Sequence, residues 1–389
     1  MPEAIVVGSG AKGDGRVSVT VGVAPEVEVT TADPRLFERG IREVVDETLA
    51  KLGRIRAKVQ VADEGALDYV LAARLEAAVR SALPKSRPIA PPVERRPSLA
   101  DAPRRSRLYA PGNHPRVLAG IELHDADVVL LDLEDSVPPA EKAAARVLVK
   151  HLLAAIDFPN EVWVRVNALA DGGEADVREV LLGRPHGIAL PKAESADDVR
   201  ALARLLDEVE GEMGRASRTT WIMPIVETAC GVLHADEIAG ADPRVVVVAL
   251  GAEDFTRDVG ARRTPEALLF ARSMVVIAAK AAGVQASDTV YARVDDEDGL
   301  AAEAELARDL GFDGKGAIHP TQIAVIHEAF SPDEQEMEQA RKIVAAAQEA
   351  EARGLGAIAI EGRMIDRPVL ERARRTLQFA DRLATRRKP

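Results

Sequence analysis

The sequence has one cysteine, Cys230, no long apolar run and no excess of positive charge. A single cysteine excludes an internal disulfide framework and is typical of a reducing cytoplasm; we expect Cys230 to be a small buried residue. No apolar run approaches the roughly 20 residues of a membrane-spanning helix, and the N-terminus lacks the basic start and apolar stretch of a secretory signal. The formal charge of −12 argues against general nucleic-acid binding. We therefore expect a cytoplasmic protein that binds neither membranes nor nucleic acid.

Prolines crowd one short stretch of the chain, residues 84–103, at positions 84, 88, 91, 92, 97 and 103. Proline is excluded from helix interiors and cannot donate a ladder hydrogen bond, so this stretch predicts a stiff, extended linker. At 389 residues the chain is longer than one typical core supports. We therefore expect a first domain over residues 1–83, a linker over 84–103, and a second domain over 104–389.

The first domain has the pattern of a small α+β unit. Residues 16–21 and 27–30 alternate apolar and polar side chains like half-buried strands, and residues 56–61 predict a third strand. Apolar side chains recur at helical spacing over residues 41–52, and residues 68–82 predict a second helix.

The second domain alternates short apolar runs with helical segments. Eight runs predict strands, over residues 108–110, 128–132, 162–166, 187–190, 221–226, 245–250, 289–292 and 316–318. Near-continuous apolar runs are typical of strands that are buried on both faces. Eight such units over about 230 residues match a (β/α)8 barrel, the TIM barrel. A doubly wound sheet stays open as an alternative, because a strand count does not show closure.

Polar residues follow nearly every predicted strand. They are Asn113, Glu134, Asp135, Asn167, Lys192, Glu227, Glu253, Asp254 and His319. In barrel enzymes the carboxyl ends of the strands carry the chemistry. This placement predicts an enzyme with its active site at that face.

Glu227 and Asp254 follow two successive apolar runs and are our predicted metal ligands. Two carboxylates, with the other positions open to water and substrate, suit Mg²⁺, with Mn²⁺ as an alternative ion. Glu134 and Asp135 would accept hydrogen bonds from metal-bound waters. The alternative is that all four acids only cap helices or counter helix dipoles.

Two cations accompany the acids. Arg165 should point into the barrel mouth, where it either pairs with a structural acid or binds a substrate carboxylate with two hydrogen bonds. Lys192 is either a Schiff-base lysine or, as we expect, a lysine in a structural ion pair. A metal with an arginine suits a 2-oxo acid, whose ketone the metal would polarise in aldol or Claisen-type chemistry.

The ordered motifs resemble those of citrate lyase beta-subunit-like aldolases, from about residue 104 to the C-terminus. They are LYAPGN (108–113), LDLEDSV (131–137) with Lys142 and Arg146, VRVN (164–167), LPKAE (190–194), ETACG (227–231), GAEDF (251–255) and IHP (318–320). The resemblance implies a (β/α)8 barrel, often trimeric or hexameric. It also implies Mg²⁺ on Glu227 and Asp254, a 2-oxo acid carboxylate on Arg165, and acyl-CoA thioesters as substrates.

The same resemblance implies further roles. Gly251, Ala252 and Glu253 are expected to contact the substrate, and Glu134 and Asp135 join Arg165 as catalytic residues. EGRMID (361–366) resembles the C-terminal lid motif of the family, whose aspartate reaches a neighbouring subunit's site and moves a proton on the acetyl-thioester methyl. That role falls on Asp366. From the sequence alone Asp366 would be an ordinary helix cap before Pro368.

The first domain resembles the acyl carrier (gamma) subunit of citrate lyase, through GIREVVDETLA (40–50) and DEGALDYVLAAR (63–74). In that family a serine carries a phosphoribosyl-dephospho-CoA arm, and the matching position here is Lys12. Lysine cannot form the phosphodiester, and neither Ser9 nor Ser18 aligns. We therefore expect no covalent arm and an enzyme that acts on free CoA thioesters.

A stretch at residues 8–13 fits G-x-G-x-x-G, but a turn and a strand follow it where a dinucleotide-binding site requires a helix. We reject that interpretation. The predicted function is a Mg²⁺-dependent lyase or synthase that interconverts a 3-hydroxy-acyl-CoA with acetyl-CoA and a 2-oxo acid, with thioester hydrolysis as a variant. The alternative is an assembly subunit that depends on a separate CoA-transferase.

Overall fold

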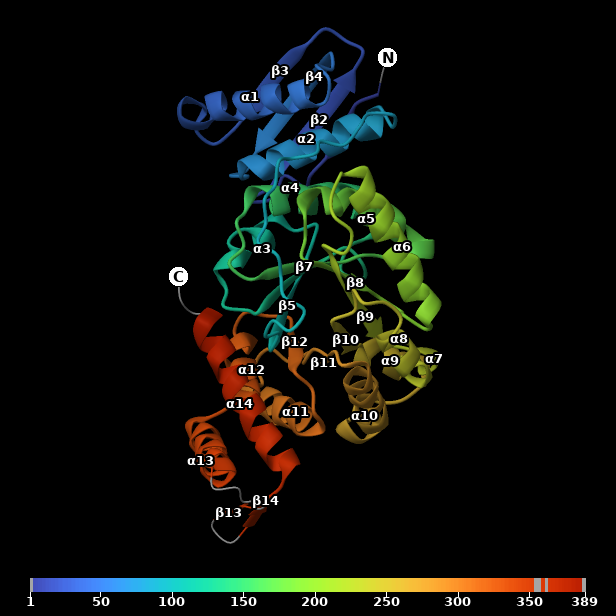
Figure 1. The fold of residues 1–389 in the computed structure, drawn as a ribbon. Coiled ribbons are helices and arrows are strands. Elements are labelled where there is room, and N and C mark those ends of the chain that lie inside the picture. Colours follow the sequence, from blue (N-terminus) through green and yellow to red (C-terminus); the bar gives the residue numbers. More distant parts are fainter. Residues whose placement is uncertain (1–2, 353–357, 361–362, 387–389) are drawn as a thin grey trace.

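The computed structural model describes residues 3–352, 358–360 and 363–386. A four-stranded α+β unit lies on one side of a central barrel, and a helical hairpin from the C-terminal part of the chain lies on the opposite side (Figure 1). No helix among the described residues is both long enough and apolar enough to cross a membrane.

The N-terminal unit is one mixed sheet with two helices. Its strands are β1 (Ile5–Val7), β2 (Gly15–Val21), β3 (Glu26–Thr30) and β4 (Ala57–Asp63), in the order β1-β2-β4-β3. Its helices are α1 (Pro34–Lys51) and α2 (Asp68–Ala82), and α2 has the bounds predicted from the sequence. The α+β prediction for this unit is confirmed.

Helix α2 belongs to two cores at once. Leu71, Leu75 and Val79 pack with the sheet of the N-terminal unit. Tyr69 and Ala73 belong to the core that surrounds the barrel strands. Because one rigid helix lies in both cores, the N-terminal unit is fixed to the barrel.

The barrel consists of eight parallel strands that close on themselves. They are β5 (Ser106–Pro111), β6 (Val128–Asp132), β7 (Glu161–Arg165), β8 (Gly187–Leu190), β9 (Trp221–Val226), β10 (Val247–Leu250), β11 (Gln285–Asp288) and β12 (Gly314–Ala317). Alternate residues face inward, such as Val128 and Leu130, or outward toward the helices, such as Val129 and Leu131. Both faces are buried, which explains the continuous apolar runs. The TIM-barrel prediction is confirmed, and closure excludes the doubly wound sheet.

The seventh predicted strand is wrong. Residues 289–292 are not a strand; β11 lies directly before them, and β12 likewise begins two residues before the predicted eighth strand. The reason is chemical, because buried charges replace apolar side chains here. Asp288 in β11 accepts hydrogen bonds from Arg272 at 2.9 and 3.0 Å and from Lys315 of β12 at 2.8 Å. A search for apolar runs misses strands that are built around a buried ion-pair cluster.

Helices surround the barrel between its strands. They are α3 (Pro115–Leu118), α4 (Lys142–Ala155), α5 (Gly173–Val180), α6 (Ala196–Glu212), α7 (Ala229–Leu233), α8 (Ala235–Ala239), α9 (Ala252–Asp258), α10 (Pro265–Ala282), α11 (Glu297–Leu310) and α12 (Gln322–Phe330). Local signals set their ends. Helix α10 begins with the Thr264 side chain capping the Ala267 N–H and proline at its first position, and it ends at Gly283 with φ 75°.

Two further segments complete the fold. Residues 84–103 contain no helix or strand and are held against the barrel, where Arg95 donates to the carbonyls of Arg184 and Leu153 at 2.8 and 2.6 Å. After the barrel come α13 (Glu334–Ala352), the strand pair β13 (Ile358–Ile360) and β14 (Arg363–Ile365), and α14 (Arg367–Arg386). Helices α13 and α14 pack through Ile343 and Ala373 into the hairpin on the far side of the barrel.

Candidate active site

A cavity of about 360 Å³ opens at the carboxyl ends of the barrel strands. Residues of seven strand ends and loops line it: Tyr109, Ala110, Pro111, Asp132, Asp135, Ser136, Arg165, Ile225, Glu227, Leu250, Gly251, Ala252, Glu253, Asp254, Thr289, Val290 and Ile318. Seven of the nine predicted site residues are among them. The structure therefore brings together Asp135, Arg165, Glu227 and the segment 251–254, as predicted.

Glu227, at the end of β9, is one of two deeply buried acids that line the cavity, with 2% of its surface exposed, as for Asp132. Its Oε1 accepts the backbone N–H of Lys192 at 2.8 Å. Burial, together with the negative charges of Glu134 and Asp254, raises the pKa of Glu227 to about 8. Carboxylates this close together repel one another, and a bound cation would offset that repulsion.

Gly251 leaves room beside the carboxylate of Glu227 because it has no side chain. Gly251 precedes α9, and a Cβ at this position would lie 2.4 Å from Oε2 of Glu227. Asp254 follows in the first turn of α9 and pairs with the exposed Arg257 at 2.5 Å. A side chain at position 251 would therefore overlap Glu227, and the donor set of two carboxylates suits Mg²⁺.

Among the described residues, no group of three or more His, Cys, Asp or Glu side chains could hold a metal ion. A cation between Glu227 and Asp254 would therefore complete its coordination with water or substrate oxygens. This is how Mg²⁺ is usually held in enzymes.

Arg165, at the end of β7, is held by acids and an aromatic ring. Its Nε and Nη2 donate to the two carboxylate oxygens of Asp132 at 2.7 and 2.9 Å, and its Nη1 lies 2.9 Å from Oε2 of Glu134. The guanidinium also lies over the ring of Tyr109, 5.5 Å from its centroid. An arginine has five N–H donors, so donors remain for a ligand in the cavity. The first of the two alternatives for Arg165, a structural ion pair, is therefore present. It does not exclude the second, in which Arg165 binds a substrate carboxylate.

Glu134 does not line the cavity directly but pairs with two cations, of which Arg165 lines it. Besides Arg165, it pairs with Lys192 Nζ at 2.5 Å, and Asp135 lies 3.9 Å from the same ammonium. Burial lowers the pKa of Lys192, but the hydrogen bond and charge of Glu134 raise it more, so that it lies above its ordinary value. A Schiff-base lysine needs a lowered pKa. Lys192 is thus the ion-paired lysine that we expected.

Lys192 also has an unusual backbone, with φ 51°. A non-glycine residue in this region carries strain that the surrounding structure must hold in place. Here the conformation directs the N–H of Lys192 to Glu227 while its side chain reaches Glu134. One residue thereby links the predicted metal ligand to the acid behind Arg165.

The other polar residues after the strands hold loops in place. Asn113 donates to Glu141 at 2.6 Å, Asn167 donates to Asp176 at 2.6 Å, and His319 contacts the Thr321 hydroxyl at 2.9 Å. The prediction that Cys230 is buried is wrong. This cysteine is exposed on α7, a short helix at the rim, with Sγ 3.5 Å from Nδ1 of His234.

Three of the cavity residues that sequence reasoning missed bear directly on the site. Asp132 ends an apolar run and looked like part of the strand, yet it fixes Arg165. Tyr109 and Thr289 also line the cavity, and the Thr289 hydroxyl accepts the Ala252 N–H at 3.2 Å. A charge at the last position of a barrel strand was the available signal for Asp132.

Asp366 lies directly before α14 and accepts the Val369 N–H at 3.1 Å, the geometry of a helix cap. It is exposed and does not line the cavity of its own chain. Glu361 and Gly362 of the predicted motif lie outside the described residues, and the three residues before Asp366 form β14.

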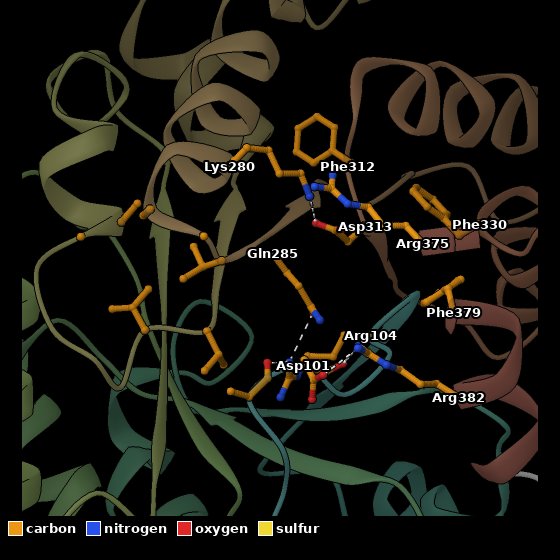
Figure 2. A pocket seen from close by; sticks show the side chains of 18 of the residues that line it. Asp101, Arg104, Lys280, Gln285, Phe312, Asp313, Phe330, Arg375, Phe379 and Arg382 are labelled. Carbon is orange, nitrogen blue, oxygen red and sulfur yellow. Dashed lines mark hydrogen bonds and ion pairs between the residues drawn. The ribbon is translucent and has the colours of Figure 1, made fainter. Parts of the chain in front are cut away.

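A larger cavity, of about 1100 Å³, lies at the other end of the barrel, between the amino ends of β10–β12 and helix α14 (Figure 2). None of the predicted site residues lines it. Its charged side chains largely neutralise one another: Lys280 pairs with Asp313 at 2.5 Å, and Arg382 with Asp101 at 2.8 Å. In barrel enzymes this end serves stability, so the smaller cavity is the candidate active site.

Comparison with known proteins identifies the families that match this chain. The family model of the HpcH/HpaI aldolase/citrate lyase family matches residues 105–320. An acyl-carrier family described as the malonate decarboxylase delta subunit (MdcD) matches residues 3–82. Both resemblances found in the sequence are confirmed.

Relatives and solved structures match the second part of the chain. Citrate lyase subunit beta of Haemophilus influenzae is 40% identical over 281 residues, 71% of this chain and 97% of the relative. A (3S)-malyl-CoA thioesterase of Cereibacter sphaeroides is 38% identical over 286 residues, 72% of this chain and 96% of the relative. The crystal structure of CitE from Mycobacterium tuberculosis with magnesium, acetoacetate and coenzyme A matches with a TM-score of 0.60 and 35% identity, over 73% of this chain and 100% of that one.

Proposed function

Because this chain belongs to the HpcH/HpaI aldolase/citrate lyase family, we propose that it is a magnesium-dependent carbon–carbon lyase. It cleaves or forms a 3-hydroxy-acyl-CoA thioester, such as citryl-, malyl- or citramalyl-CoA, with acetyl-CoA and a 2-oxo acid on the other side. The observation that carries the proposal is the buried Glu227 carboxylate beside Asp254 and Arg165 in one cavity. The solved relative that holds magnesium, acetoacetate and coenzyme A supports it.

Glu227 and Asp254 would hold Mg²⁺, or Mn²⁺ in its place. When bound, the ion polarises the ketone oxygen of the 2-oxo acid and stabilises negative charge that develops there. Gly251 keeps the space beside Glu227 open. Ala252 and Glu253 line the same wall and would contact the substrate.

Arg165 would bind the carboxylate of the 2-oxo acid with the donors that Asp132 and Glu134 leave free. Those two acids fix the plane of the guanidinium before the substrate arrives, so little orientation is lost on binding. Lys192 balances the charge of Glu134, and Asp135 at the rim would accept hydrogen bonds from waters in the cavity.

Asp366 would act in another copy of the chain. It does not line the cavity of its own chain, and it is exposed between β14 and α14. There its carboxylate would move the proton on the acetyl-thioester methyl. We therefore infer a homo-oligomer, a trimer or a hexamer.

We also propose that the protein is located in the cytoplasm. Residues 1–83 and 104–389 would be its two domains, joined by residues 84–103.

Thioester hydrolysis is the second candidate activity, because a (3S)-malyl-CoA thioesterase is among the relatives. The decisive assay incubates the purified chain and Mg²⁺ with citryl-, malyl- and citramalyl-CoA. Acetyl-CoA and a 2-oxo acid indicate the lyase, and free CoA with an intact hydroxy acid indicates hydrolysis. No turnover, with the fold and Mg²⁺ binding intact, would contradict both activities and favour an assembly subunit that needs a separate CoA-transferase.

A further inference from the structure

The loop between β1 and β2, residues 8–14, is a rigid, glycine-rich loop. Gly8, Gly10 and Gly13 have φ of 97°, 67° and 82°, a region that glycine adopts without a steric cost. Asp14 is 3% exposed and accepts hydrogen bonds from the Ser9 N–H at 3.0 Å and from Arg74 of α2 at 3.0 and 3.1 Å. A buried ion pair therefore fixes the shape of the loop.

Three cations surround this loop. Lys12 is exposed at its tip. Arg16 lies beneath Gly10, since a Cβ built on Gly10 would be 3.5 Å from Cβ of Arg16. Arg116 of the barrel lies beside Gly13, since a Cβ built there would be 3.8 Å from Cβ of Arg116. Within the described part of the chain, none of the three forms an ion pair, although the chain carries a net charge of −12.

The loop also offers backbone donors. The N–H groups of Ser9, Ala11, Gly13 and Asp14 are used inside the N-terminal unit. Those of Gly10 and Lys12 have no partner among the described residues. Free N–H groups on a glycine-rich loop, with unpaired lysine and arginine side chains around it, form a site for phosphate oxygens.

This loop is near the active-site cavity. Arg116 lies in α3, directly after β5, and Tyr109, Ala110 and Pro111 of β5 line the cavity. Pro111 and Arg116 are five positions apart in the chain, so their Cα atoms are at most about 18 Å apart. A CoA thioester in the cavity extends through its long pantetheine arm to the nucleotide phosphates, which are therefore in reach of the loop.

We propose that the loop 8–14, with Lys12 from the N-terminal unit and Arg116 from the barrel, binds the nucleotide phosphates of the CoA substrate without a covalent bond. The inference rests on the proposed function, because it takes the CoA thioester as the ligand. It gives the N-terminal unit a role as a fixed wall of the substrate site, built from both parts of the chain.

The test measures binding of free CoA to the full-length protein by calorimetry. The double variant Lys12→Ala/Arg116→Ala should bind CoA about tenfold or more weakly, because charge-assisted hydrogen bonds are lost. Pantetheine, which lacks the nucleotide, should bind both proteins equally. Raised salt should weaken CoA binding to the wild type more than to the variant. Circular dichroism checks the fold.

The matched control is Lys85→Ala. Lys85 is another exposed lysine of the N-terminal half, just past the far end of α2, a 15-residue helix about 22 Å long. It should leave CoA affinity unchanged. Equal CoA affinity in the wild type and the double variant, or a loss of the same size in Lys85→Ala, overturns the proposal. Binding of inorganic phosphate as tightly as CoA also overturns the proposal, because the loop would then bind an adventitious ion only.

Kinetics separate this proposal from the proposed function. If the chain is a lyase, the double variant should raise KM for the CoA thioester and leave kcat and the KM for a pantetheine thioester unchanged. Loss of turnover on both thioesters to the same degree would contradict the phosphate role. If neither the wild type nor the double variant cleaves any thioester, but the double variant still binds CoA more weakly, the lyase assignment fails and the phosphate site stands.

Discussion

Replacement of Glu76 should loosen the N-terminal unit from the barrel in a pH-dependent way. Glu76 of α2 is completely buried, and its carboxylate accepts hydrogen bonds from Lys150 at 2.5 Å and His151 at 2.6 Å, both on α4 of the barrel. Its Oε1 also accepts the Ile89 N–H at 3.0 Å. Glu179 of α5 pairs with the same Lys150 at 2.7 Å. The two parts of the chain thus share one buried charge network.

The expected magnitude follows from the carboxyl group of Glu76. Burial alone would raise its pKa, but the hydrogen bond from His151 and the charge of Lys150 lower it to about 2, from 4.5. At 1.36 kcal/mol per unit, the ionised carboxylate contributes about 3 kcal/mol to the free energy of unfolding. Because the folded pKa is below the unfolded one, this contribution is complete above about pH 5 and is lost as the pH falls toward 2.

The variant Glu76→Gln keeps the shape and removes the charge. At pH 7 it should lower the free energy of unfolding by about 3 kcal/mol, the range for breaking a buried ion pair. The loss should shrink toward zero near pH 2. Urea unfolding of the full chain, followed by circular dichroism at several pH values, measures both. Glu43→Gln, which removes an exposed ion pair with Arg39 on α1, is the control and should cost less than about 1 kcal/mol. A pH-independent loss, or none, would refute this reasoning.

Four further outcomes concern the active site. Asp254→Ala should abolish Mg²⁺-dependent turnover with the fold intact, and undiminished Mg²⁺ affinity by calorimetry would remove Asp254 from the ligands. Gly251→Ala should weaken Mg²⁺ binding at least about tenfold, since its Cβ would lie 2.4 Å from the Glu227 carboxylate; unchanged affinity would contradict the need for glycine. Arg165→Lys should raise KM for the 2-oxo acid more than for acetyl-CoA in the condensation assay, because lysine cannot make the paired hydrogen bonds; equal increases would contradict its role. Mg²⁺ affinity should rise with pH up to about 8 and then level off, because the ion displaces the proton that Glu227 holds below its pKa; a flat profile in calorimetry would argue against Glu227 as a ligand.

The sequence predicted most of the fold because eight strands alternate regularly with helices and six of them, β5 to β10, contain a clear apolar run. It misplaced β11 and β12, where Asp288 and Lys315 are buried as a pair instead of apolar side chains. A search for periodicity tests the polarity of each residue separately, whereas a buried ion pair neutralises two residues that are 27 positions apart. Pairings of this kind become visible only when the strands are placed side by side.

The same limit applied to the site. Position at or after the end of a strand predicted that Glu227, Asp254 and Arg165 share one face, since every parallel strand of a barrel ends there, and all three line the cavity. The partners that set their chemistry came from other strands: Asp132 fixes Arg165, and the strained backbone of Lys192 supports Glu227. No spacing rule links residues 33 or 35 positions apart.

The packing of α2 supports the proposal that the carrier-like unit contributes to this site without a covalent arm. A carrier that shuttles a bound group must move relative to the enzyme that it serves. Here α2 is part of both cores, and Glu76 ties it to α4, so movement would expose apolar surface and leave buried charges unpaired. A fixed unit cannot shuttle a substrate, but it can hold one end of it. The resemblance places the expected arm position at Lys12, in a loop that is fixed by a buried ion pair and lies beside Arg116. The lysine at the expected serine position and the fixed packing of the unit therefore both support the proposal of a stationary binding surface for free CoA thioesters.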